Sequence, residues 1–211
     1  MDDKNALLAD LDFAATLARD AANTPLLGGV YFLIWSSLLV PTLLIHGGVL
    51  QGWAPLDPSN LGMLWLGYAV IGITLSTAYG TLSAKKSGSN TFLNRLSRAS
   101  GIVLCTLIFT FAAAISVAVG SGQIGIVAFN LILSFAFGLN AFHLAVLGAL
   151  SGKRYLRWSA LIAGIAMVLT VFYNQDSGVY FIAAVGVCLS MALPGILEVR
   201  AEHRHEPAPS A

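Results

Sequence analysis

The sequence predicts an all-α, polytopic membrane protein: a six-transmembrane-helix bundle with an N-terminal cytoplasmic amphipathic helix. Composition is the first observation behind this prediction. Of the 211 residues, 57% are hydrophobic and only 10% are charged, and the mean hydropathy is +0.79. Soluble domains are about 45–50% apolar and about 25% charged. A chain of this size cannot bury so much apolar surface in water, which excludes an ordinary soluble enzyme, a disordered chain and a DNA-binding domain.

Six long apolar runs are the second observation, because a membrane-spanning helix needs about 20 predominantly apolar residues. Strands of a membrane barrel are only about ten residues long and alternate apolar with polar residues. Runs of this length and uniformity therefore predict helices. In the last run, Pro194 should loosen the final turns because it has no backbone N–H to donate. The runs cover residues 25–46, 61–84, 99–120, 123–150, 156–173 and 179–197.

The placement of lysine and arginine is the third observation. All eleven lie in the N-terminal segment, the second and fourth connections or the C-terminal segment, and the other three connections hold none. By the positive-inside rule, both termini are then cytoplasmic. We therefore divide the chain into a cytoplasmic amphipathic helix (1–24), a six-helix transmembrane domain (25–198) and a flexible cytoplasmic tail (199–211).

The N-terminal segment predicts a helix over residues 5–21, with Leu7, Leu8 and Leu11 recurring at helical spacing. Residues 2–20 carry five aspartates against one lysine and one arginine, a net charge of −3. Helices that lie on the anionic inner leaflet are normally basic, so this one should prefer a basic protein surface. That surface is either the chain's own second connection or another protein. The candidate docking residues are Leu7, Asp10, Leu11, Lys85, Lys86, Arg95 and Arg98.

Polar residues inside the runs are few. No Asp, Glu, Lys or Arg lies in the middle of any run, which argues against a pump with buried carboxylates, a retinal-binding lysine and a charged ion filter. His143 lies in the fourth run, with Asn140 one turn before it on the same face. Such residues either hydrogen-bond neighbouring helices or line a ligand cavity.

The second run adds Gly72, Ser76 and Gly80, whose small side chains at four-residue spacing let helices approach closely. Its cytoplasmic half also carries several hydroxyl groups. If the second and fourth runs adjoin, they would line a polar pocket open to the cytoplasm. The candidate pocket residues are Asn140, His143, Ser76 and Thr77.

No catalytic, cofactor or metal site is predicted. The sequence contains no HExxH, GxSxG or Walker motif. His46 and His143 differ in depth by about 25 Å at the rise of a helix, so they cannot share one haem. Cys105 and Cys188 both lie in apolar runs, where cysteine behaves as a small hydrophobe.

Three short stretches are similar to a group of uncharacterised multi-helix bacterial inner-membrane proteins, often encoded beside small winged-helix regulators. The resemblance rests on Pro25-Leu26-Leu27-Gly28-Gly29-Val30-Tyr31 with Trp35, on Leu64-Trp65-Leu66-Gly67-Tyr68, and on Leu193-Pro194-Gly195. It implies the bacterial inner membrane as the location and transfers no chemistry to individual residues.

Two functions fit these observations. The uncharged membrane core and the acidic helix favour a non-enzymatic protein that acts through protein partners, as an accessory subunit or a signalling or regulatory component. The alternative is a small-solute or lipid-like transporter or channel, as a monomer or homodimer, using the Asn140/His143 region. Expected partners are the lipid bilayer and either another protein or a second copy. A net charge of +1 provides no general attraction for nucleic acid.

Overall fold

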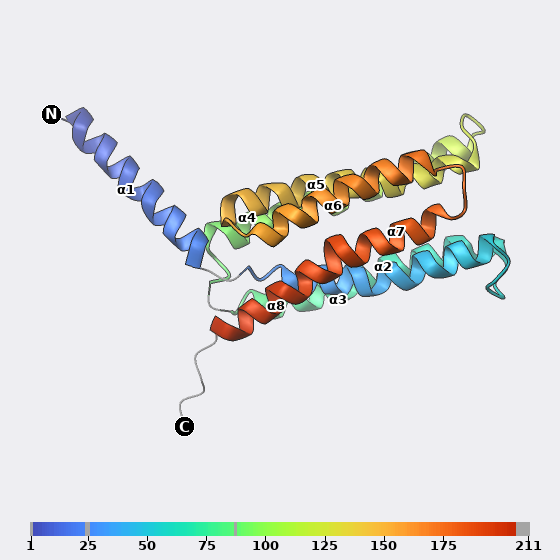
Figure 1. The fold of residues 1–211 in the computed structure, drawn as a ribbon, viewed down its shortest axis with the longest axis horizontal. Helices are drawn as coiled ribbons and strands as arrows, with labels where there is room; N and C mark the ends of the chain where they lie inside the picture. Colours follow the sequence, from blue (N-terminus) through green and yellow to red (C-terminus); the bar gives the residue numbers. More distant parts are fainter. Residues whose placement is uncertain (1, 24–25, 87, 206–211) are drawn as a thin grey trace, which may run out of the picture.

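The computed structural model describes residues 2–23, 26–86 and 88–205, and most of these residues are helical, with no strand among them (Figure 1). Six helical segments are long and apolar enough to cross a membrane, and we treat the chain as a multi-pass membrane protein. The α-helices are α1 (Asp2–Asn23), α2 (Gly29–Leu50), α3 (Leu61–Ser83), α4 (Phe92–Gly120), α5 (Leu131–Ser151), α6 (Arg154–Phe172), α7 (Val179–Val187) and α8 (Leu193–His205).

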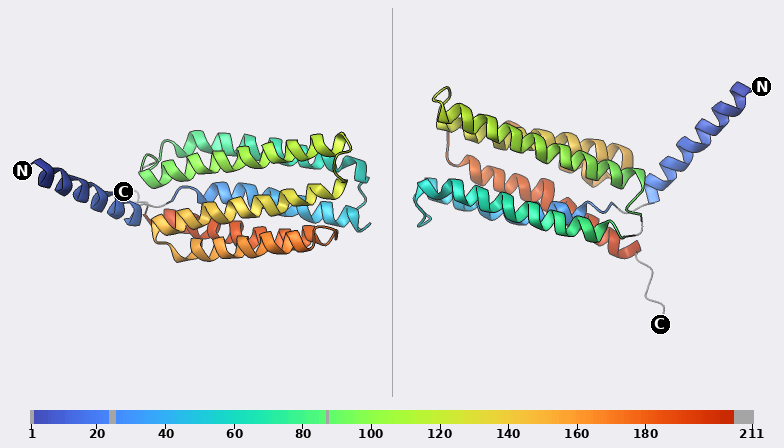
Figure 2. Two further views of the ribbon diagram at one scale, coloured as in Figure 1. Left: turned by 90° about the horizontal axis from the view of Figure 1, so that it is seen from above. Right: turned by 180° about the vertical axis from the view of Figure 1, so that it is seen from behind.

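The spanning helices form two layers of three (Figures 1 and 2). One layer contains α4, α5 and α6, with α5 in the middle. The other contains α3, α2 and the α7–α8 segment, with α2 in the middle. Contacts between α6 and α7 join the two layers along one side. On the opposite side, α3 and α4 leave most of their side chains exposed, as expected of helices that face lipid.

Two apolar clusters make the core. One packs Leu43 of α2 and Phe137 of α5 against small residues of α6 and α7, including Ala163 and Ala183. The second packs Leu144 and Leu147 of α5 with residues at the starts of other helices. The close packing of the first depends on Gly186, because a Cβ there would stand 2.9 Å from both Phe137 and Ala166.

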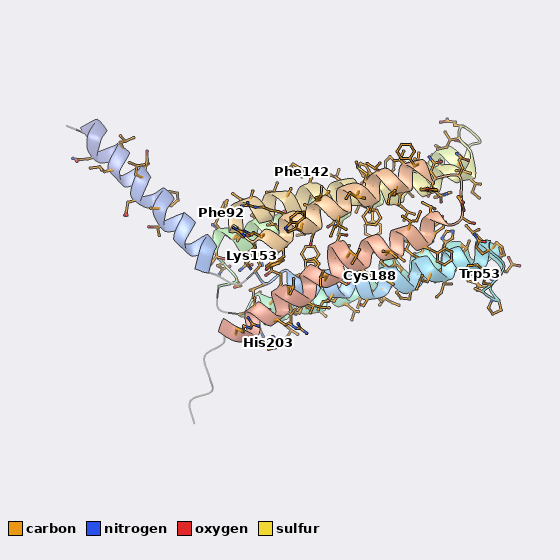
Figure 3. All side chains as sticks on the ribbon, viewed as in Figure 1. Trp53, Phe92, Phe142, Lys153, Cys188 and His203 are labelled. Atoms are coloured by element: carbon orange, nitrogen blue, oxygen red, sulfur yellow. The ribbon has the colours of Figure 1, made fainter. Side chains whose placement is uncertain are left out.

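The fold confirms that connections with and without lysine or arginine alternate between the two ends of the bundle. The second and fourth connections lie at the same end of the bundle as α1 and the C-terminal part of α8, and we call this the basic end (Figure 1). Figure 3 shows Lys153 and His203 near this end and Trp53 at the opposite end. Every described lysine and arginine outside α1 therefore belongs to one end of the bundle.

Three predicted helix starts were wrong: one was too late, since α4 begins at Phe92 and not at residue 99, and two were too early. The first run was expected to be helical from residue 25, but α2 begins at Gly29. The backbone N–H of Leu27 donates to Asn94 Oδ1 at 2.9 Å, which holds residues 26–28 as a turn against α4. The fourth run was expected from residue 123, but it opens with a turn and a 3₁₀-helix, Ile126–Asn130, and α5 begins at Leu131.

The last span differs in two ways. A π-helical turn, Cys188–Ala192, precedes Pro194, and the N–H of Leu193 donates to the carbonyl of Cys188 five residues earlier. The proline ring would otherwise crowd the carbonyl of Ser190, so the predicted loosening is confirmed as a widened turn. The tail was expected from residue 199, yet α8 continues to His205. Residues 206–211 lie outside the described part of the chain.

Candidate functional site

Asn140 and His143 lie together on the buried face of α5, with 6% and 8% of their surface exposed. The imidazole Nδ1 of His143 is 3.0 Å from the Ser100 hydroxyl on α4. Its ring meets the edge of Phe32 from α2, with ring centres 6.1 Å apart. The side-chain nitrogen of Asn140 is buried and has no hydrogen-bond partner among the described residues. The site therefore joins α4, α5 and α2.

The other half of the candidate pocket is elsewhere, because the condition for the pocket, that the second and fourth runs adjoin, is not met. α3 packs along α2 and not along α5. Its small residues Gly72 and Gly80 rest on the aromatic rings of α2, as close-approach spacing predicts. Ser76 lies between them with a buried hydroxyl that has no partner in the described chain. Thr77 is exposed and donates to Ile73 O of its own helix at 2.8 Å.

The candidate docking residues do not come together either. Leu7, Asp10 and Leu11 are exposed on α1, which extends away from the bundle (Figures 1 and 2). The main contacts of α1 with the bundle are to α4 and α5. On the bundle, Lys85, Arg95 and Arg98 are exposed, whereas Lys86 is paired with Glu202 of α8.

A cluster at the basic end was missed by sequence reasoning, and we call Glu198, Glu202, Lys86, Lys153 and Tyr155 the carboxylate clasp. Glu198 is 1% exposed and Glu202 is 5% exposed. Glu198 accepts hydrogen bonds from Lys153 Nζ at 2.9 Å and from the Tyr155 hydroxyl at 2.6 Å. Glu202 accepts one from Lys86 Nζ. The four-residue spacing of the two carboxylates was a signal that they share a helix face.

The carboxylate clasp ties both layers together. Lys153 directly precedes α6 in one layer, and Lys86 follows α3 in the other. Both carboxylates come from α8, so this helix holds the two layers at the basic end. The hydrogen bond that Lys86 donates to Glu202 raises the pKa of Lys86 above its ordinary value, and the ammonium also lies 5.7 Å from the centre of the Tyr79 ring. A buried pair with matched partners is best explained as a structural tie.

A second network lies toward the opposite end of the bundle. The indole N–H of Trp65 donates to His46 Nδ1 at 2.8 Å, and the imidazole stacks on Tyr180 at 3.9 Å. The Tyr180 hydroxyl donates to Asn130 Oδ1 at 2.6 Å, and the Asn130 amide donates to Asn174 O at 2.6 Å.

No group of three or more His, Cys, Asp or Glu side chains that could hold a metal occurs among the described residues. Buried side-chain polar atoms without a partner in the described chain belong to Ser76, Tyr79 and Asn140. Comparisons with protein-family models, with curated proteins and with solved structures find no match for this chain.

Proposed function

We propose that this chain is a non-enzymatic protein of the bacterial inner membrane that acts through a protein partner bound by α1. The observation that carries the proposal is the exposure of large apolar side chains on that helix. Leu7, Leu8 and Leu11 are 54–61% exposed. The three leucines share one face at helical spacing. An apolar face outside the membrane-spanning bundle needs a cover, either lipid or protein.

Charge favours protein over lipid as the cover. The segment 2–20 has a net charge of −3, and the inner leaflet is itself anionic. An acidic helix with an apolar face fits a protein groove that is apolar at its floor and basic at its rim. This mode of recognition suits an accessory subunit or a signalling component.

The proposed orientation has both termini in the cytoplasm, with the basic end of the bundle facing inward. It is supported by the gathering of the described basic side chains outside α1 at that end. In this orientation, α1 and the carboxylate clasp lie on the same side of the membrane, where a cytoplasmic partner could contact α1.

The test compares two double variants of the full chain. Leu7→Glu with Leu11→Glu places two charges on the leucine face. Ala9→Glu with Thr16→Glu adds the same charge on the opposite face, where both residues are also exposed. Each chain is expressed at its native level, cross-linked in native membranes and purified in mild detergent, and bound proteins are quantified by mass spectrometry.

We expect one stoichiometric partner with the wild-type chain and with the Ala9/Thr16 control. The Leu7/Leu11 variant should lose that partner while keeping the thermal stability of the bundle. Retention of the same partner by both variants would refute a role for the leucine face. Recovery of the wild-type chain alone, or only with lipid, would refute the proposal as a whole.

A further inference from the structure

The side-chain amide nitrogen of Asn140 on α5 is buried without a hydrogen-bond partner in the described chain, which is energetically unfavourable. Only 6% of the surface of Asn140 is exposed to solvent. Buried polar atoms in native proteins nearly always have a partner, whether protein, water or ligand. An apolar side chain would avoid this cost, so an unpaired amide here points to a missing partner.

His143 presents a complementary group one turn along the same helix face. The Ser100 hydroxyl donates to Leu96 O at 2.7 Å, so its oxygen is free to accept from His143 Nδ1–H at 3.0 Å. This arrangement places the imidazole proton on Nδ1 and leaves Nε2 as an acceptor. Nε2 forms no hydrogen bond with any described residue. Residues three apart are neighbours on a helix surface, so the site offers an amide donor and an imidazole acceptor on one face of α5.

The surroundings select an uncharged ligand. α5 contains no charged residue, and bringing a charge into this part of the membrane would be costly. The site lies between Phe137 in one apolar cluster and Leu144 in the other. These clusters keep bulk water away on both sides along α5.

We propose that Asn140, His143 and Ser100 form a binding site for a small uncharged solute with a carboxamide or urea group. The carbonyl of such a group accepts from Asn140, and its N–H donates to His143 Nε2. This inference is independent of the partner proposed for α1, because the site involves neither α1 nor the basic surface residues.

The experiment uses the full chain in lipid nanodiscs, with ¹⁵N-labelled imidazoles and acetamide as the probe. The His143 resonances are assigned by their loss in His143→Phe. We expect acetamide to shift the Nε2 resonance to saturation. Acetone, which has the carbonyl but no N–H, should bind about three- to tenfold more weakly, the range expected for one hydrogen bond inside a membrane.

Asn140→Leu should abolish saturation by acetamide. The matched control is Ser134→Ala on the same helix, whose hydroxyl is already paired with Thr170 at 2.9 Å, and it should bind acetamide like wild type. A linear, non-saturating response in the wild-type chain would overturn the proposal. Equal responses to acetamide and acetone would overturn it too, and that comparison needs no variant to fold. Exchange with bound water but no response to acetamide would show a water site only.

Discussion

Gly29 and Glu198 are packed so closely that a Cβ on Gly29 would stand 2.6 Å from Glu198 Cβ. The same Cβ would stand 2.9 Å from the carbonyl of Gly195, and one on Gly195 would stand 3.0 Å from the carbonyl of Gly29. α2 and α8 therefore approach each other through their backbones, as small residues allow in membranes. This approach places Glu198 against the first turn of α2 and excludes water from its carboxylate.

Gly29→Ala should destabilise the bundle, because the added methyl group has no free space. Overpacking of this kind costs about 1–3 kcal/mol. The control is Gly164→Ala in α6, where a Cβ would have nothing within 4 Å; it should be neutral or stabilising by up to about 1 kcal/mol, since alanine is the better helix former. Thermal unfolding in detergent measures both, and equal melting temperatures would contradict the close approach.

Glu198→Leu should be among the most damaging changes at the basic end. It leaves Lys153 half-buried without its carboxylate, and breaking a buried pair costs about 3–5 kcal/mol. The double variant Glu198→Leu with Lys153→Leu should recover much of that loss, because no unpaired charge remains. Tyr155→Phe removes one hydrogen bond and should cost about 1 kcal/mol. A double-mutant cycle of unfolding free energies measures the coupling, and additive effects would argue against the clasp.

The bond between Lys86 and Glu202 should weaken at high pH. The hydrogen bond to Glu202 raises the pKa of Lys86 in the folded protein. A raised folded-state pKa contributes stability that is complete below the unfolded pKa, about 10.4 for lysine. That contribution is lost as the pH rises through the folded pKa. The melting-temperature difference between wild type and Lys86→Met should therefore stay constant from about pH 7 to about pH 10 and then shrink. A difference that already shrinks between about pH 7 and about pH 9 would contradict this assignment.

The orientation proposed for the bundle makes opposite predictions for its two ends. In a background with Cys105 and Cys188 replaced by alanine, Ser121→Cys should react with a membrane-impermeant maleimide in intact bacterial cells. Lys85→Cys, at the basic end, should react only after the membrane is permeabilised. Both positions are exposed, so access to the reagent is the only difference. Labelling of Lys85→Cys in intact cells would reverse the proposed orientation.

The number and alternation of the spans could be predicted from sequence because apolar length and the placement of lysine and arginine are properties of local sequence. Helix ends were less predictable, since they depend on distant partners. The turn before α2 is held by Asn94, 67 residues away. Residues 126–130 are as apolar as those that follow, so hydropathy could not separate a 3₁₀-helix from α5.

The candidate site was predictable only within one helix. Asn140 and His143 share a face of α5 because of their spacing. Hydropathy does not determine which helices are neighbours within a layer. For that reason Ser100 was missed, and Ser76 was placed with them although it lies elsewhere. Glu198 and Glu202 lie where an apolar run ends, and from sequence alone such residues are predicted to be exposed to solvent. Their burial depends on lysines from two connections that the fold brings to α8.

The π-helical turn before Pro194 has a consequence for chain length. It adds one residue to a turn, and one residue corresponds to about 100° of rotation in an α-helix. Because the extra residue is contained in that one turn, deleting a single codon within Cys188–Ala192 would restore regular α-helical winding and leave the residues after it facing as they do now. A deletion in the α-helical turns of the same span would instead rotate Glu198 and Glu202 by that angle, away from Lys153 and Lys86. The π-helical turn is therefore the place where the last span can lose one residue and keep its two carboxylates in phase with the rest of the protein.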